Sequence, residues 1–286
     1  MTVERVGVVG CGLMGSGIAE VCARAGTDVV VREADEALLR AGAARIEQSL
    51  GRAVRAGKVS EDERERALGR LHFSTDWEAM ADRQLVVEAV TEDTDAKLAV
   101  FRDLDRTVAA SEAVLASNTS SIPIMKLAMA TGRPEQVIGI HFFNPVPVLR
   151  LVELVTSLLT SDDTAEHAEA FVTSRLSKLV IRSQDRAGFV VNAMLIPYLL
   201  SAVRMFESGF ASREDIDTGM VEGCAHPMGP LALADLIGLD TTQAVAQSLY
   251  EEFKEPLYAP PPLLSRMVEA NLLGRKTGRG FYDYSR

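Results

Sequence analysis

The sequence predicts an α/β protein in which a mostly parallel sheet domain, residues 1–187, precedes an all-helical C-terminal domain, residues 188–286. Three observations carry this prediction. Short β-branched runs alternate with helical patterns up to about residue 187, as they do in βαβ units. A glycine-rich turn joins the first of these runs to a helical run. From Gly188 onward the strand-like runs stop and helical patterns alone continue.

The predicted strands are the short apolar runs at 6–9, 29–31, 85–89, 114–117, 137–140, 151–155 and 178–182. Helical patterns connect the early runs, which predicts parallel pairing. The last two runs follow at short distance or after one helix, so we expect the sheet to end in antiparallel strands. A long helical stretch over about 35–71 separates the second and third runs. The predicted helices of the second domain lie at 188–208, 213–222, 231–236, 241–254 and 263–273.

The first strand ends in a glycine-rich loop. It reads Gly10-Cys11-Gly12-Leu13-Met14-Gly15, and a helical run follows at once. A G-x-G-x-x-G pattern between a strand and a helix is typical of a Rossmann-type dinucleotide site. The first glycine permits a tight turn, the second lets a pyrophosphate approach the backbone, and the third lets helix and strand pack closely. The alternative interpretation is an ordinary tight turn.

The second strand is followed by Arg32-Glu33. An acidic side chain at this position can accept hydrogen bonds from the adenine-ribose hydroxyls and would repel a 2′-phosphate. Glu33 therefore favours NAD over NADP. Arg32 weakens that argument, because an arginine here can accommodate the extra phosphate. A solvated charge at a strand end is the alternative for Glu33.

Positive charge gathers in the helical stretch between the second and third strands. Residues 40–58 contain Arg40, Arg45, Arg52, Arg55 and Lys58 against one acid, Glu47. Arg45, Arg52 and Arg55 are spaced to lie near one helix face. Such a cluster suits a phosphorylated ligand, and the alternative is a solubilising surface.

Composition excludes several classes of protein. Thirty Lys and Arg against 40 Asp and Glu give a net charge of −10, which argues against nucleic acid binding over the whole surface. No apolar run reaches the length of about 18 residues that a membrane span needs. Cys11, Cys22 and Cys224 have no disulfide-like or metal-like spacing, so we expect a reducing, cytoplasmic environment and no metal site.

Later motifs carry a resemblance that covers almost the whole chain. In order they are N-T-S-S at 118–121, I-G-I-H-F-F-N-P-V-P at 138–147, L-V-E-L at 151–154, G-F-V-V-N at 188–192, H-P-M-G-P at 226–230 and G-R-K-T-G-R-G-F-Y at 274–282. This set resembles the L-3-hydroxyacyl-CoA dehydrogenase family, in particular its stand-alone bacterial 3-hydroxybutyryl-CoA dehydrogenases. The resemblance implies NAD-dependent interconversion of (S)-3-hydroxyacyl-CoA and 3-oxoacyl-CoA, with the four-carbon pair expected.

The H-F-F-N-P-x-P block contains the expected acid/base residue. His141 closes an apolar strand, and the run at 151–155 could return beside it and bring Glu153 to the imidazole. A carboxylate on one ring nitrogen fixes the tautomer and stabilises the imidazolium. The other nitrogen would exchange a proton with the 3-oxygen of the substrate. The family gives the matching His and Glu these roles, whereas a lone histidine would more often be a satisfied core residue.

Two further residues complete the catalytic set that the resemblance implies. Ser120 follows a strand end, and its hydroxyl is expected to bind the 3-oxygen of the substrate. Helix capping is the alternative, because Ser120 or Ser121 precedes Ile122-Pro123, and Ser121 is the expected cap. Asn192 begins the first helix of the second domain, and its amide is expected at the same reacting centre. The active site would then lie between the domains.

The resemblance also assigns cofactor and CoA contacts. Glu92, Lys97 and Asn118 match positions on the nicotinamide side, with an exposed Glu92–Lys97 pair as the alternative. Arg52 is the best-matched CoA phosphate contact, followed by Arg55 and Lys58. Relatives have a lysine where this chain has Ala56, so one phosphate contact is expected to be weaker or supplied by Arg55.

Two other functions remain open on the sequence alone. The first is a dehydrogenase of a free 3-hydroxy acid, against which the basic stretch argues. The second is a non-catalytic protein that has kept the fold, against which the complete set of Ser120, His141, Glu153 and Asn192 argues. The helical domain is expected to supply a homodimer interface, because its apolar surface exceeds what one thin helical layer buries.

Overall fold

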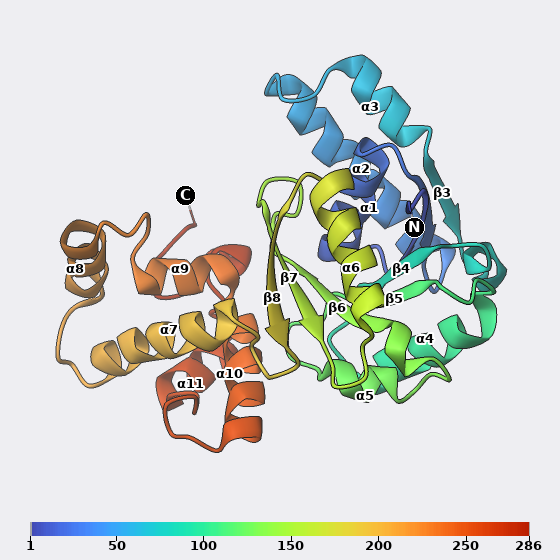
Figure 1. Ribbon diagram of the computed structural model, residues 1–286. Coiled ribbons are helices and arrows are strands. Elements are labelled where there is room, and N and C mark those ends of the chain that lie inside the picture. Colours follow the sequence, from blue (N-terminus) through green and yellow to red (C-terminus); the bar gives the residue numbers. More distant parts are fainter. Residues whose placement is uncertain (1, 286) are drawn as a thin grey trace. The chain divides into compact units, whose positions relative to one another are not determined.

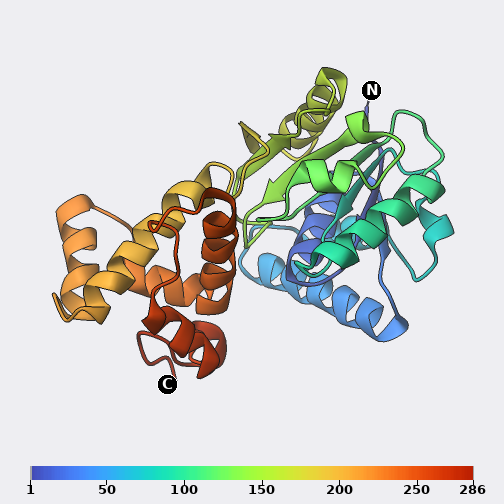
Figure 2. The same cartoon turned by 90° about the horizontal axis from the view of Figure 1, so that it is seen from below.

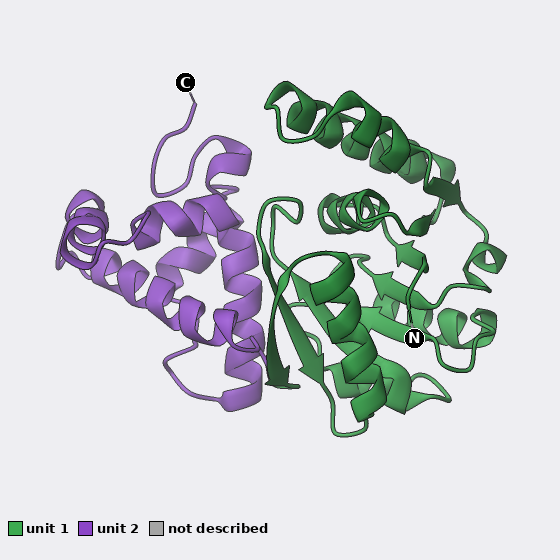
Figure 3. Cartoon of the chain, turned by 45° about the horizontal axis from the view of Figure 1, so that its top comes forward, with its two compact units in different colours: residues 1–186 green, residues 187–286 purple. Residues whose placement is uncertain are grey.

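The computed structural model describes residues 2–285, and the chain divides into two compact units, residues 1–186 and 187–286 (Figure 3). Each unit has its own cluster of buried apolar side chains, which is what an independent domain requires. The predicted fold class, a mostly parallel sheet with helices followed by a helical region, is confirmed.

The first unit is built on an eight-stranded sheet with the order β3-β2-β1-β4-β5-β6-β7-β8 (Figure 1). The strands are β1 (Arg5–Val9), β2 (Asp28–Arg32), β3 (Leu71–Ser74), β4 (Leu85–Glu88), β5 (Val114–Ser117), β6 (Val137–Phe142), β7 (Leu151–Thr156) and β8 (Leu179–Gln184). Neighbours pair in parallel from β3 to β6, whereas β7 runs antiparallel to β6 and parallel to β8. The expected antiparallel end of the sheet is therefore present.

Helices flank both faces of this sheet (Figure 2). They are α1 (Leu13–Arg24), α2 (Glu36–Arg55), α3 (Glu61–Leu68), α4 (Thr94–Thr107), α5 (Ile124–Ala128) and α6 (Asp162–Ala170), with short turns η1 (Trp77–Met80), η2 (Pro134–Gln136) and η3 (Phe171–Arg175). Ile18 of α1 and Ala168 of α6 share one buried cluster with Val8 of β1 and Ile140 of β6. Because side chains alternate along a strand, the neighbours of Val8 in β1 and of Ile140 in β6 face the other side of the sheet.

One strand was not predicted. The stretch at 35–71, expected to be helical throughout, contains α2 and α3 separated at Gly57, whose φ of +67° suits glycine. Its last residue begins β3, an edge strand in which His72 and Phe73 are exposed. β3 is only four residues long and Leu71 is its only buried residue, so its alternation of Leu71 and Phe73 is too short to predict a strand.

The second unit is helical, as expected. It comprises α7 (Val191–Glu207), α8 (Arg213–Cys224), α9 (Pro230–Ile237), α10 (Leu239–Phe253), α11 (Pro262–Glu269) and the turn η4 (Arg275–Thr277). Asp217 of α8 accepts hydrogen bonds from the backbone N–H groups of Leu231 and Ala232 at the start of α9. Across residues 2–285, no helix has the length and apolar character that crossing a membrane demands.

Candidate active site

Strand register brings the candidate polar residues to one face and one end of the sheet. Glu88 at the end of β4 pairs with Ser117 at the end of β5, and Ser117 pairs with Gly139 of β6. His141 lies two residues beyond Gly139 and therefore points to the same face. The carboxyl ends of parallel strands are where open α/β sheets bind their ligands.

His141 and Glu153 form a buried pair across two antiparallel strands. They lie directly opposite each other in the β6–β7 register, and Nδ1 of His141 is 2.7 Å from Oε2 of Glu153. Glu153 is fully buried and His141 is 4% exposed. An ionised carboxylate accepts but cannot donate, so Glu153 holds the Nδ1–H tautomer of His141. The antiparallel return thus brings together two residues that are 12 apart in sequence.

The second ring nitrogen of His141 faces Ser120. Nε2 lies 3.0 Å from the Ser120 hydroxyl, and with the proton on Nδ1 this nitrogen accepts the hydrogen bond. The Phe143 ring packs against the imidazole, with 4.6 Å between ring centroids. The structure therefore joins Ser120, His141 and Glu153 in one chain of contacts, an arrangement that can move a proton to or from an atom placed beside Nε2 and the serine hydroxyl.

Glu92 fixes the loop that carries Ser120. Its Oε1 accepts hydrogen bonds from the backbone N–H groups of Ser120 (2.9 Å) and Ser121 (3.1 Å), and from the hydroxyls of Thr119 and Ser121. Burial alone raises the pKa of Glu92, but Lys97 and these hydrogen bonds outweigh it, and the pKa lies below its ordinary value. The carboxylate is thus the form that holds the loop.

The prediction that Ser121 caps the following helix is wrong. The short helix α5 starts after Pro123 with no side-chain cap from its own turn. Instead, the carboxylate of Asp185 accepts hydrogen bonds from the backbone N–H groups of Ile124 (2.8 Å) and Met125 (2.7 Å). A carboxylate distant in sequence satisfies the orphan donors, and the Ser121 hydroxyl turns to Glu92 instead.

Lys97 is buried rather than exposed. Its side chain is 1% exposed, and its Nζ lies 2.6 Å from Oε1 of Glu88 and 3.3 Å from Oε2 of Glu92. Glu88 also accepts hydrogen bonds from the Val90 N–H and the Ser117 hydroxyl. Glu88 is a site residue that was not predicted, although an acid that closes an apolar strand indicates a buried partner. Lys97 therefore bridges two carboxylates and positions Glu92.

Asn118 links β5 to β6, whereas Asn192 belongs to the other unit. Oδ1 of Asn118 accepts a hydrogen bond from the Phe142 N–H at 2.9 Å, next to His141. Asn192 lies in the first turn of α7, in the second unit, and its expected role at the reacting centre stays a prediction.

The glycine loop has the features that a dinucleotide needs. Gly10 has φ +92°, and a Cβ on Gly15 would lie 1.8 Å from the Gly10 carbonyl oxygen, so both positions require glycine. A Cβ on Gly12 would meet no atom of the described chain within 4 Å. Packing of the protein itself does not demand glycine there, which is consistent with room kept for a pyrophosphate. Leu13 and Met14 open α1, whose N-terminus has no side-chain cap and so keeps its N–H groups for an anion.

Glu33 and Arg32 are held differently. Oε1 of Glu33 accepts a hydrogen bond from the Cys11 N–H of the glycine loop at 2.5 Å, so the carboxylate lies against this loop. The guanidinium of Arg32 stacks 4.1 Å from the centre of the Trp77 ring and donates to the Thr75 carbonyl. These contacts hold Arg32 toward Trp77.

A cavity of about 260 Å³ lies between α1, α2 and the loop after β6. Its polar lining includes Arg45, Ser49 and Arg52 of α2, and Asn144 lies on the loop side. Leu13 of the glycine loop also lines this groove. Arg55 and Lys58 are exposed but do not line it, so of the predicted CoA contacts only Arg52 faces this groove.

Cys11 lies in the glycine loop, but its surroundings do not activate the thiol. Burial raises the pKa of Cys11 to about 12, with the Glu33 charge adding to the effect, so its thiol is a poor nucleophile. Within residues 2–285 no group of three or more His, Cys, Asp or Glu side chains is arranged to hold a metal ion.

Comparison with known proteins gives matches along nearly the full chain. Residues 5–186 match the family model of the 3-hydroxyacyl-CoA dehydrogenase NAD binding domain, and residues 188–284 match that of the 3-hydroxyacyl-CoA dehydrogenase C-terminal domain. A 3-hydroxybutyryl-CoA dehydrogenase of Mycobacterium tuberculosis is 62% identical over 282 residues, which is 99% of each chain.

Relatives with lower sequence identity carry the same enzyme name. A probable 3-hydroxybutyryl-CoA dehydrogenase of Deinococcus radiodurans is 47% identical over 98% of this chain and 100% of its own. The crystal structure of (S)-3-hydroxybutyryl-CoA dehydrogenase from Ralstonia eutropha superposes with a TM-score of 0.94 at 46% identity, and covers 100% of both chains.

Proposed function

The chain belongs to the 3-hydroxyacyl-CoA dehydrogenase family, and from that membership we propose that it interconverts (S)-3-hydroxybutyryl-CoA and acetoacetyl-CoA. The broader activity, NAD-dependent oxidoreduction of 3-hydroxyacyl-CoA, follows from the two family domains and from highly similar relatives that carry the 3-hydroxybutyryl-CoA dehydrogenase name. The four-carbon substrate and the roles of individual residues are the proposal. The observation that carries the residue roles is the buried Ser120–His141–Glu153 chain.

His141 is the proposed acid/base. In the oxidation direction its Nε2 takes the proton of the 3-hydroxyl, and Glu153 stabilises the resulting imidazolium through the 2.7 Å contact at Nδ1. When substrate binds, the Ser120 hydroxyl is proposed to donate to the 3-oxygen instead of to Nε2, which places that oxygen beside the imidazole. In the reduction direction the imidazolium returns the proton to the 3-oxygen. Asn192 is proposed to donate to the substrate carbonyl from the second unit.

NAD supplies the hydride acceptor, or as NADH the donor, when it is bound. The proposed holders of its phosphates are the N–H groups around Gly12, Leu13 and Met14, with Gly10 and Gly15 allowing the tight turn. Glu33 would accept hydrogen bonds from the adenine ribose. On the nicotinamide side, Glu92 and Asn118 are the proposed contacts. Because the Lys97 ammonium lies between Glu88 and Glu92, we assign it the positioning of Glu92.

NAD rather than NADP is the proposed cofactor. A 2′-phosphate would meet the negative Glu33 carboxylate, which already lies against the glycine loop. Arg32, the cation next to Glu33 in the chain, is engaged by Trp77 and Thr75. Moving Arg32 to a phosphate would cost these contacts.

CoA is proposed to enter along the groove between α2 and the loop after β6. Arg52 and Ser49 line this groove, so an arginine with no carboxylate within 4.0 Å among the described residues faces it. Arg55 and Lys58, exposed one turn further along the chain, would meet only a ligand that extends past the groove. A free 3-hydroxy acid would use none of these charges.

A direct test compares acetoacetyl-CoA with free acetoacetate, each with NADH and NADPH, by following the absorbance of the reduced cofactor. The proposal predicts fast oxidation of NADH with the CoA ester and slow reaction with the free acid. An Arg52→Gln variant should raise KM for acetoacetyl-CoA by about tenfold, the size of one charge-assisted contact, and leave kcat unchanged. Equal rates on both substrates would overturn the CoA proposal, and preference for NADPH would overturn the role of Glu33.

We also propose a homodimer formed through the second unit, in a reducing cytoplasmic environment. Met194 and Phe210 of that unit are 75% and 79% exposed, an unusual amount for large apolar side chains. Sedimentation that finds a monomer at working concentration would contradict the dimer. The cysteines Cys11, Cys22 and Cys224 are all free thiols, the state that a reducing compartment maintains.

A further inference from the structure

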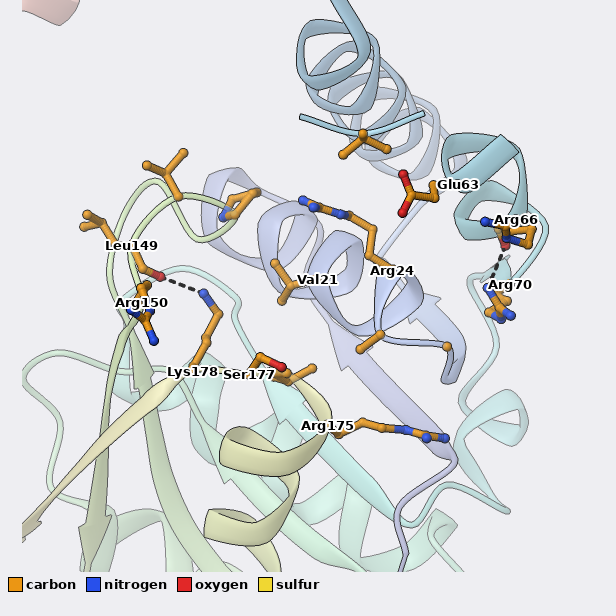
Figure 4. Close-up of a pocket in the computed structure, with 16 residues that line it drawn as sticks. Val21, Arg24, Glu63, Arg66, Arg70, Leu149, Arg150, Arg175, Ser177 and Lys178 are labelled. Carbon is orange, nitrogen blue, oxygen red and sulfur yellow. Dashed lines mark hydrogen bonds between the residues drawn. The ribbon is translucent and has the colours of Figure 1, made fainter. Parts of the chain in front are cut away.

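A cavity of about 480 Å³ lies at the C-terminal end of α1, away from the residues proposed for the chemistry. The last turn of α1 forms its floor, with α3 on one side and the β6–β7 loop and the segment 175–178 before β8 on the other (Figure 4). We call it the basic pocket, because its lining contains six cationic side chains, Arg24, Arg66, Arg70, Arg150, Arg175 and Lys178, against a single acid, Glu63.

These cations are largely uncompensated. Arg24 reaches Glu20 at 3.5 Å, but within residues 2–285 the other four arginines have no carboxylate within 4.0 Å. Nε of Arg175 is buried without a hydrogen-bond partner in the same part of the chain. In a protein of net charge −10, this is a local concentration of positive charge, and such a concave surface focuses an anion-attracting field.

Lys178 places a cation at a fixed position in the lining of the basic pocket. It is 9% exposed, and its Nζ donates to the carbonyl oxygens of Val146 (2.7 Å) and Leu149 (2.6 Å). Burial lowers the pKa of Lys178, and a nearby anion would stabilise its charged form. An ammonium has three donors, so one remains for a ligand. Figure 4 places Arg150 beside Lys178, so two cations flank the same wall.

The remaining lining is apolar. Val21, Val59, Leu149 and Leu176 contribute aliphatic surface, which a simple inorganic anion would not use. The volume falls in the range of about 300–1,000 Å³ that is usual for organic ligands. Cations spread around aliphatic side chains fit a ligand with a flat, weakly polar ring system and several separated negative groups.

We propose that the basic pocket binds a nucleotide that carries two or more phosphates. No residue of the pocket belongs to the Ser120–His141–Glu153 chain, so the site is separate from the chemistry. Two sources could supply this ligand. One is the phosphorylated adenosine end of a CoA ester, since the CoA groove shares Pro147 with the basic pocket, and this source rests on the proposed function. The other is a free nucleotide acting as an effector.

The test is calorimetric titration of the full chain with adenosine 3′-phosphate 5′-diphosphate and, separately, with inorganic triphosphate. Saturating NADH keeps the dinucleotide site filled throughout. The double variant Arg150→Gln/Arg175→Gln should weaken binding by about tenfold or more, because two charge-assisted contacts are lost. The matched control Arg102→Gln/Arg106→Gln, which removes two charges from α4, should stay within about twofold of the unmodified chain.

Two measurements separate the sources, and each source supports the site. If CoA displaces the probe, and the double variant raises KM for acetoacetyl-CoA but not for acetoacetyl-pantetheine, the ligand is the CoA end. If the probe binds beside CoA and both KM values stay unchanged, the ligand is a free nucleotide. Absent binding of both probes, or equal loss in the control, overturns the proposal. Neither result depends on turnover, so failure of the proposed function is seen separately.

Discussion

Replacing Glu153 by glutamine probes the catalytic pair with little change of shape. Oε2 of Glu153 lies 2.7 Å from Nδ1 of a buried His141, and a charge-assisted hydrogen bond contributes about 1.5–3 kcal/mol. At about 1.4 kcal/mol per factor of ten, that loss lowers kcat by about 10- to 150-fold. The amide can also present its NH₂ group to Nδ1 and enforce the wrong tautomer, which extends the expected fall toward about 10⁴-fold.

The assay is the initial rate of NADH oxidation with saturating acetoacetyl-CoA. Affinity for NADH, measured by fluorescence titration, should change by no more than about twofold, because the substitution lies outside the glycine loop. The control is Glu112→Gln, which removes the same charge from an exposed position and should leave kcat unchanged. If Glu153→Gln retains kcat within about threefold of the unmodified enzyme while remaining folded, the reasoning about the imidazolium is refuted.

Three other substitutions test the surroundings of the site. Lys97→Met leaves Glu88 buried without its ammonium partner, so the free energy of unfolding should fall by about 3–5 kcal/mol. Chemical denaturation would measure this loss, and adding Glu88→Gln should recover part of it. Glu33→Ala removes the acceptor at the Cys11 N–H, so kcat/KM for NADH should fall by about tenfold or more and the NADPH/NADH ratio should rise; an unchanged ratio would show that Glu33 does not select the cofactor. The folded-state pKa of Glu92 lies below its ordinary value of 4.5, so its carboxylate adds stability that is fully present above that value and is lost as pH falls through the lowered pKa. The stability gap between the unmodified chain and Glu92→Gln should therefore be largest near neutral pH and close in acid, and a gap independent of pH would contradict this.

The sequence predicted the architecture well because periodicity follows burial. The buried strands β1, β4, β5 and β6 are apolar runs, and their alternation with helices indicates a parallel sheet. β3 escaped prediction because it is an edge strand with two of its four residues exposed. Local pattern cannot reveal such a strand, whose place is fixed by pairing with β2.

Some contacts between site residues could likewise be predicted from the sequence, and others could not. His141 and Glu153 could be paired in advance because a strand and its antiparallel return link them within a short stretch. The roles of Glu88 and Asp185 could not be predicted, because each residue depends on a partner that tertiary structure brings to it. Lys97 lies on α4, nine residues after Glu88, but their contact depends on how α4 packs beside the end of β4. Asp185 caps α5 from 60 residues away. Sequence spacing carries no record of such contacts.

The proposed mechanism depends on His141 to move the proton at the 3-oxygen of the substrate. The most direct measurement is the turnover of acetoacetyl-CoA by a His141→Ala variant, together with NADH affinity measured on the same preparation. We expect kcat to fall by about 10²–10⁴-fold, the usual contribution of general acid–base catalysis, while NADH binds as it does to the unmodified chain. Near-normal turnover in this variant would show that another group moves this proton.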